Sequence, residues 1–151
     1  MSVFDQLIEG AKKDGITKFV AGACIANAAG QVLMLQRSVD EFLLEIWEIP
    51  SGGVEDGETL EQALIREVRE ETHLDVLRIG DCLNTFDYIS GSGRRARQFN
   101  FIVEVKDLAP LRLSSEHQEL AWVVDPSQVE PLVTPEMRAT VRAFIGQQKA
   151  A

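Results

Sequence analysis

The sequence is poor in cysteine and has no long apolar run. Its two cysteines, Cys24 and Cys82, lie far apart, and no cysteine and histidine spacing matches a zinc site. We therefore expect buried, reduced thiols in a cytoplasmic protein. No stretch reaches the roughly 18 apolar residues that a membrane-spanning helix needs, and residues 1–13 lack the apolar centre of a signal peptide. The sequence predicts no membrane partner.

Positive charge is also scarce. The chain has 15 lysines and arginines against 24 aspartates and glutamates, which gives a net charge of −9. Nucleic-acid binding needs a basic footprint, so we do not expect a nucleic-acid partner. A phosphorylated substrate is compatible with this charge if arginines, a helix N-terminus or metal ions lie between the protein and the phosphate.

The apolar pattern predicts helices and strands that are intermixed along the chain. Helices are predicted at 1–14, 59–72 and 135–147, and strands at 18–26, 31–36, 47–49, 98–105 and 119–124, with one or two more within 74–90. Residues 40–45 and 51–58 are predicted loops, and 91–93 a hairpin tip. We expect residues 1–151 to form one α+β domain, a mixed β-sheet between helices in an α/β/α sandwich.

The helix at 59–72 has the clearest signals. Thr59 and Gln62 have the spacing of a capping box. Leu60, Leu64 and Val68 recur every four residues and supply an apolar stripe for the core.

Three glutamates crowd the end of this helix. Glu67, Glu70 and Glu71 lie at i, i+3 and i+4, on an arc of about 100°. Like charges at these spacings cost about 0.2–0.5 kcal/mol per pair, and the negative end of the helix dipole adds to the cost. A divalent cation would reverse both penalties, and oxygen ligands favour magnesium or manganese. The alternative is a solvated helix face.

A glycine-rich loop precedes the helix. Gly52, Gly53 and Gly57 permit tight turns and a close approach of the backbone to an anion. The alternative for the loop alone is an ordinary turn. Loop and helix together place backbone groups and carboxylates around one point, which favours a phosphate and metal site.

The stretch 52–74 resembles the signature box of the Nudix hydrolases, the MutT-like family. In that pattern a glycine is followed after five residues by a glutamate, and after seven more by Arg-Glu-hydrophobic-x-Glu-Glu-x-Gly-hydrophobic. The matching residues are Gly52, Glu58, Arg66, Glu67, Val68, Glu70, Glu71 and Leu74. One position departs, because His73 replaces the last glycine. We expect His73 to adopt the left-handed conformation that glycine takes after a helix.

The resemblance implies a fold, a reaction and a set of residues. It implies a Nudix-type fold and hydrolysis of a pyrophosphate bond by a metal-activated water, with Mg²⁺ as cofactor and Mn²⁺ as an alternative. It assigns the metal to Glu67, Glu70, Glu71 and the Ser51 carbonyl, with Glu116 as an extra ligand. It assigns catalysis to Glu67, Glu70, Arg66 and Glu116. Glu58 is expected to support Arg66 and the loop from behind.

The general base is left open between Glu70 and a glutamate outside the box. The segment 114–118 is similar to one in dinucleoside polyphosphate hydrolases, and Glu116 within it is the leading candidate. Glu119 is the second candidate, and a polar loop without a catalytic role is the alternative. His117 is expected to order the loop.

Substrate contacts are expected from glycines, arginines and aromatic residues. Gly52 and Gly53 are candidates for backbone contacts, and Arg37, Arg94, Arg95 and Arg97 are candidates for phosphate contacts. Phe86, Tyr88 and Phe99 have aromatic rings for stacking on a base, with core packing as the alternative. The substrate is expected to be a small nucleotide pyrophosphate, such as a dinucleoside polyphosphate, a nucleoside triphosphate or a nucleotide sugar. A monomer and a homodimer are both open.

Two other functions compete with hydrolysis. A non-hydrolytic nucleotide-sensing Nudix module is one alternative, although such modules usually lose box glutamates that this chain keeps. An isoprenoid diphosphate isomerase is the other, and it would need a catalytic cysteine such as Cys24.

Overall fold

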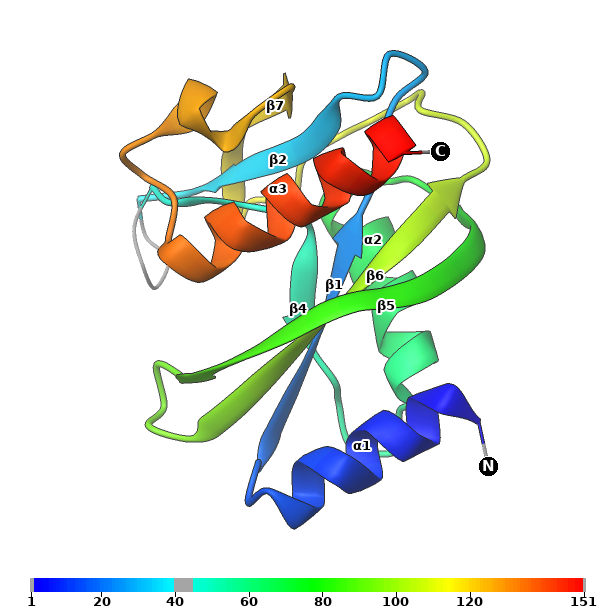
Figure 1. Ribbon diagram of the computed structural model, residues 1–151, viewed down its shortest axis with the longest axis vertical. Coiled ribbons are helices and arrows are strands. Elements are labelled where there is room, and N and C mark those ends of the chain that lie inside the picture. Colours follow the sequence, from blue (N-terminus) through cyan, green and yellow to red (C-terminus); the bar gives the residue numbers. More distant parts are fainter. Residues whose placement is uncertain (1, 40–44, 151) are drawn as a thin grey trace.

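The computed structural model describes residues 2–39 and 45–150. In chain order its elements are α1 (Val3–Lys13), β1 (Lys18–Cys24), β2 (Val32–Arg37), β3 (Trp47–Glu48), β4 (Ser51–Gly53), α2 (Leu60–Thr72), β5 (Val76–Ile89), β6 (Arg95–Val105), β7 (His117–Val123), the 3-10 helix η1 (Pro126–Val129) and α3 (Pro135–Ala150) (Figure 1). Among the described residues, no helix has the length and apolar character needed to cross a membrane.

The strands form two sheets. One has the order β4-β1-β6-β5, and the other has the order β3-β2-β7. The strands β1 and β6 run parallel, and the other pairs are antiparallel. The predicted mixed pairing is therefore confirmed, but it is distributed over a four-stranded and a three-stranded sheet.

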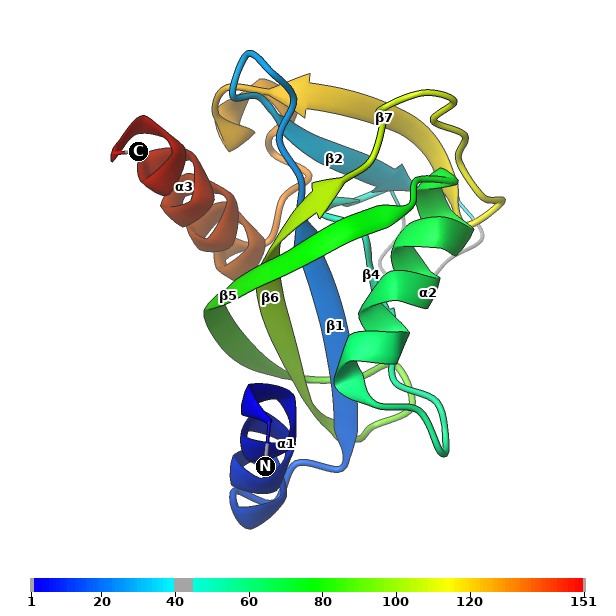
Figure 2. The ribbon, with the colours of Figure 1, turned by 90° about the vertical axis from the view of Figure 1, so that its right-hand side faces the viewer.

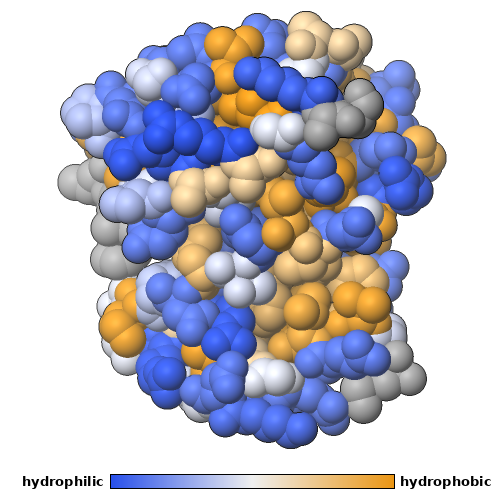
Figure 3. Space-filling view, in the orientation of Figure 1, coloured by the Kyte–Doolittle hydropathy of each residue, from blue (hydrophilic) through white to orange (hydrophobic). Residues whose placement is uncertain are grey.

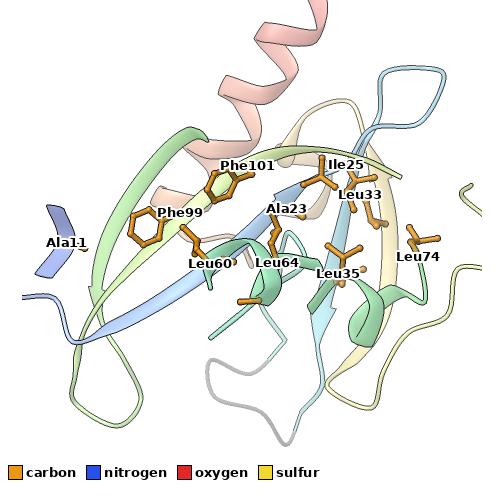
Figure 4. Close-up of a cluster of buried hydrophobic side chains, with 14 of the residues drawn as sticks. Ala11, Ala23, Ile25, Leu33, Leu35, Leu60, Leu64, Leu74, Phe99 and Phe101 are labelled. Carbon is orange, nitrogen blue, oxygen red and sulfur yellow. The ribbon is translucent and has the colours of Figure 1, made fainter. Parts of the chain in front are cut away.

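Helices cover both sides of the four-stranded sheet. Figure 2 shows α2 and α3 on opposite sides of β1 and β6, as expected for an α/β/α sandwich. One core cluster joins α1 and α2 to this sheet. In it, Leu64 of α2 points toward Ala23 of β1, and Leu60 lies toward Phe99 of β6 (Figure 4). A second cluster joins α3 to the strands through residues such as Val141 and Phe144. Side chains on the face seen in Figure 3 are mostly hydrophilic, with hydrophobic surface gathered between β5 and α1.

The helix α2 begins and ends as the sequence predicts. Thr59 accepts a hydrogen bond from the backbone N–H of Gln62 at 3.1 Å, and the Gln62 side chain accepts one from the backbone N–H of Thr59 at 2.9 Å. His73 follows the helix with φ 63° and ψ 15°, which is the left-handed conformation. Its backbone N–H donates to the Arg69 carbonyl at 2.9 Å. The predicted left-handed conformation of His73 is confirmed.

Several boundaries differ from the predictions. The predicted loop at 51–58 begins with β4, which pairs with β1. The returning strand of the hairpin begins at Arg95 and not at 98, because Arg95 pairs with Ile89 and Arg97 with Asp87 across the hairpin. The segment within 74–90 is one long strand with shifts of register. The predicted loop at 40–45 lies, apart from residue 45, outside the described residues.

Candidate active site

The turn between β4 and α2 brings the first box glycine against a box glutamate. Gly52 lies opposite Ala21 of β1. A Cβ added to Gly52 would lie 2.0 Å from the Cδ of Glu67. Any larger residue would therefore displace the Glu67 carboxylate. The sequence predicted a glycine for a close approach to phosphate, and the structure adds a contact inside the protein.

Arg66 joins the loop to the glutamates of the helix. Its Nε donates to Glu58 Oε2 at 2.7 Å and its Nη2 donates to Glu58 Oε1 at 2.8 Å. The same Nη2 donates to the Gly53 carbonyl at 2.9 Å. Its Nη1 donates to Glu67 at 2.7 Å and to Glu70 at 3.2 Å. One guanidinium thus fixes the loop, a supporting carboxylate and two candidate ligands, which is a geometry that lysine does not reproduce.

Glu71 is the most buried of the box glutamates. Its side chain is on the inner side of α2, the residue is 2% exposed, and Oε1 accepts a hydrogen bond from the Ser51 N–H at 2.8 Å. Burial, followed by the nearby carboxylates of Glu48 and Glu67, raises the pKa of Glu71 to about 9. Burial is also the main cause that raises the pKa of Glu67, although Arg66 opposes it.

Glu48 is a site residue that the sequence analysis did not single out. It is buried at the end of β3, where its Oε2 lies 3.1 Å from Arg37 Nε and 2.8 Å from His117 Nε2. Its carboxylate is one of the charges that raise the pKa of Glu71. Glu48 thus links β2, β3 and the start of β7 behind the glutamates. The only sequence signal was its place in the predicted strand at 47–49, which precedes the box.

The loop before β7 brings Glu116 to the same place. Glu116 is exposed, and its carbonyl accepts a hydrogen bond from the Ser38 N–H at 2.9 Å. Its carboxylate contributes to the raised pKa values of Glu67 and Glu71, so it lies near both. Glu119 lies within β7, opposite Gln36. His117 is buried and contacts Glu48, in keeping with an ordering role.

A cavity of about 460 Å³ adjoins the box. The residues that line it include Lys18, Val20, Arg37, Glu48, Ser51, Gly52, Gly53, Phe86, Tyr88, Gln98, Thr134, Glu136 and Met137. Three of the candidate substrate residues, Arg37, Gly52 and Gly53, thus line the same cavity. Phe86 and Tyr88 form part of its wall, whereas Phe99 is buried in the core.

The basic run after the hairpin tip lies elsewhere. Arg97 donates to both oxygens of Asp87 at 2.7 and 3.0 Å and to Asp14 at 3.0 Å. Arg95 approaches Gly15, and Arg94 donates to the Thr17 carbonyl. None of these three arginines is among the described residues that line the cavity beside the box. Arg94 instead lines a separate cavity of about 710 Å³ between α1 and the box loop.

The chemistry of the donor set fits a hard divalent cation. Glu67, Glu71 and Glu116 present oxygen atoms whose charges oppose one another, and a cation would offset this repulsion. Among the described residues, no three acidic, histidine or cysteine side chains converge as closely as the ligands of one ion do. Glu67 and Glu70 are turned toward Arg66 in this arrangement.

The cysteines do not form a second reaction centre. Cys24 is fully buried, and this burial raises the pKa of its thiol to about 12. Such a thiol is a poor nucleophile, because the thiolate is the reactive form. Cys24 is therefore unsuited to the role that an isomerase would require.

Comparisons with known proteins agree with the box and the fold. Residues 17–144 match the NUDIX domain. An RNA pyrophosphohydrolase from Sphingopyxis alaskensis is 32% identical over 83% of this chain and 88% of the relative. A MutT protein from Methanosarcina mazei has a similar structure, with a TM-score of 0.75 and 25% identity over 87% of this chain and 95% of that one.

A third similar protein is an Ap4A hydrolase from C. elegans, with a TM-score of 0.71. It is 26% identical over 89% of this chain and 100% of that one. The family match covers most of the chain, and the relative above is similar over most of both lengths. The chain therefore belongs to the Nudix family and is a pyrophosphohydrolase of that family.

Proposed function

We propose that the chain hydrolyses a pyrophosphate bond in a nucleoside diphosphate linked to another moiety, with Mg²⁺ as the cofactor and Mn²⁺ as a substitute. The observation that carries this proposal is the buried carboxylate of Glu71, surrounded by Glu48, Glu67 and Glu116 beside the cavity. Buried carboxylates without a cation repel one another, so the array favours a bound metal ion.

We assign the metal to Glu67, Glu70, Glu71, Glu116 and the Ser51 carbonyl. A bound Mg²⁺ would offset phosphate charge and lower the pKa of a water molecule. Ser51 already holds Glu71 through its N–H. This hydrogen bond holds the end of α2 against β4, the strand whose Ser51 carbonyl we assign as a ligand.

The other steps of the proposed reaction depend on residues of the chain. Arg66, held in two places by Glu58, orients Glu67 and Glu70. Either Glu70 or Glu116 accepts the proton of the attacking water at a carboxylate oxygen. Arg37 and the backbone of Gly52 and Gly53 contact substrate phosphates at the end of the cavity. The water attacks in line with the leaving phosphate, as phosphoryl transfer requires.

The relatives and the resemblance of the box support four groups of candidate substrates. The Ap4A hydrolase points to dinucleoside polyphosphates, and the resemblance of the box adds nucleoside triphosphates. The RNA pyrophosphohydrolase points to the 5′-pyrophosphate of RNA, although the net charge of −9 disfavours long nucleic acid. Nucleotide sugars complete the set. The free thiols Cys24 and Cys82 support a reducing, cytoplasmic setting.

A substrate panel with matched variants tests the proposal. We would measure products by chromatography for the four groups of substrate, each with Mg²⁺ and with chelator. Glu70→Gln should lower kcat by about 100-fold or more on the best substrate, since it removes a ligand and candidate base. Glu61→Gln, at the exposed start of the same helix, is the control and should keep the wild-type rate.

Two results would contradict the assignment. Full activity in Glu70→Gln would remove Glu70 from the mechanism. A wild-type protein that binds nucleotides but cleaves no pyrophosphate would favour the nucleotide-sensing alternative.

A further inference from the structure

One of the residues that line the cavity beside the box has a buried side-chain amide. Gln98 of β6 lines the cavity, yet it is only 5% exposed. A buried amide is costly unless its polar atoms have partners. Its Nε2 donates to Asn100 Oδ1 at 2.9 Å. The nitrogen of the amide is thus directed into the protein.

A polar network fixes this amide from behind. Asn100 Nδ2 donates to Asn84 Oδ1 at 2.9 Å, and Thr140 Oγ1 donates to the same oxygen at 3.3 Å. The network therefore crosses β6, β5 and α3. It also occupies the space above Gly22, where an added Cβ would lie 2.4 Å from Asn100 Oδ1. A rigid support of this kind keeps one orientation of the amide.

The network leaves one atom of Gln98 for the cavity. Among the described residues, none donates a hydrogen bond to Gln98 Oε1, and this oxygen is not sealed inside the protein. The position thus offers an acceptor without a partner. A ligand that supplies an N–H donor there would gain a hydrogen bond, and a ligand that supplies an acceptor would lose one.

Aromatic rings form the wall next to this oxygen. Phe86 lies opposite Gln98 in the pairing of β5 and β6, and Tyr88 follows two residues later on the same face. Their ring centroids are 6.1 Å apart, and both line the cavity. Arg37 and Gly52 line the same cavity, so the two aromatic rings and the proposed phosphate contacts share one space. A volume of about 460 Å³ is within the range of nucleoside-sized pockets.

We propose that Gln98 determines base specificity. The cavity holds a nucleobase against Phe86 and Tyr88, and Gln98 Oε1 accepts a hydrogen bond from an N–H of the base edge, as the amino group of adenine supplies. This inference rests on the proposed function, because it places the nucleoside of the substrate in the cavity beside the box. It selects bases with a donor edge over bases of the same shape without one.

Binding of reaction products tests the selectivity without turnover. We would titrate the full chain, in chelator, with adenosine monophosphate and with purine riboside 5′-monophosphate, which has the same ring but no amino group. The wild type should bind the adenosine compound about tenfold more tightly, because the other ligand leaves Oε1 without a partner. Equal affinities for the two compounds would overturn the inference.

Variants of the glutamine locate the effect. Gln98→Leu keeps the size and removes the acceptor, so the affinity ratio should fall to about one. Gln98→Glu gives up the donor to Asn100, but both carboxylate oxygens are acceptors, so one faces the cavity in either orientation and the preference should be retained. Gln147→Leu makes the same change on the exposed surface of α3 and should leave the ratio at the wild-type value. If Gln98→Leu does not fold, the wild-type ratio and Gln98→Glu still decide the question.

Failure of this inference is separate from failure of the proposed function. A wild type that cleaves nucleotide pyrophosphates but shows no preference between the two monophosphates contradicts only the role of Gln98. A wild type that shows the preference but cleaves no pyrophosphate contradicts only the proposed hydrolysis.

Discussion

At the residue scale, the Glu67 carboxylate fills the space beside Gly52 that a Cβ would need. The sequence predicts a glycine for the approach of a phosphate, and periodicity predicts a carboxylate on the helix. Neither pattern shows that the two meet. In the structure the carboxylate occupies the place where a Cβ of residue 52 would lie. The glycine is therefore needed by the protein itself, before any substrate binds.

Replacing this glycine should disable the site. In Gly52→Ala the new methyl group would displace the Glu67 carboxylate, so kcat should fall by at least about tenfold, or ~1.4 kcal/mol in the activation barrier. Steady-state kinetics measure this change. Gly10→Ala, in α1 with open space around the added Cβ, is the control. A Gly52→Ala variant as active as this control would show that Glu67 does not need its observed position.

The carboxylate of Glu58 gives a prediction on pH. Its hydrogen bonds with Arg66 are the main cause that lowers the pKa of Glu58 from 4.5 to about 2. Because the folded pKa is below the unfolded one, this stabilisation is present above pH 4.5 and is lost as the pH falls toward 2. The loss is at most about 1.4 kcal/mol per pH unit.

Unfolding by denaturant at several acidic pH values measures this effect. The free energy of unfolding of the wild type should fall more steeply between pH 4.5 and 2 than that of Glu58→Gln, which cannot be protonated. Equal acid slopes for the two proteins would show that the pair of Glu58 and Arg66 does not stabilise the fold.

Sequence reasoning found single residues where a motif marks them. The box pattern assigned Arg66 and the glutamates of α2 to one site, and the structure brings them together. It passed over Glu48, because one glutamate in a short strand has no pattern of its own. Its importance comes from burial next to Glu71 and from contacts with Arg37 and His117, which depend on tertiary folding.

At the scale of elements, α2 was the most predictable part of the chain. Its capping box, apolar stripe and left-handed end all follow from local rules, and all are present. The strand β4 was missed because glycines hide the alternation that marks a strand. The start of β6 was missed because Arg95 and Arg97 read as a charged loop. Their pairing with β5 is a long-range property.

The end of α2 provides a stability prediction. His73 has φ 63°, which costs a non-glycine residue about 1 kcal/mol. His73→Gly should therefore raise the free energy of unfolding by up to that amount. The gain should be reduced by the stabilisation lost with the contact between His73 Nδ1 and the Arg112 carbonyl at 3.3 Å. Thermal and denaturant unfolding measure the change, and activity should stay at the wild-type level. Loss of activity in a more stable variant would give His73 a role in the reaction.

At the scale of the whole molecule, Arg97 ties α1 to the long hairpin. Its guanidinium is 18% exposed and pairs with Asp87 of β5 and with Asp14 at the end of α1. The sequence placed this arginine among the phosphate contacts, because a basic run in an acidic chain favours anion binding. The partners that neutralise it come from segments far apart in the sequence. Only the assembled fold shows that its charge is used for structure.

Arg97→Gln should therefore affect stability more than substrate binding. The change leaves two carboxylates without their cation, so the free energy of unfolding should fall by about 1–2 kcal/mol. KM should stay within about twofold of the wild type, since one residue outside the cavity contributes little to substrate binding. A large rise in KM at unchanged stability would show that Arg97 contacts the substrate.

The dependence of turnover on magnesium tests the central claim most directly. We would titrate Mg²⁺ into chelated wild type and Glu71→Gln, since the amide can still accept the hydrogen bond from Ser51. The wild type should be inactive in chelator and recover with Mg²⁺. The variant should need at least about tenfold more Mg²⁺ to reach half of its maximal rate, because it has lost one charged ligand. Turnover in chelator, or the same magnesium dependence in both proteins, would contradict a metal site at these glutamates.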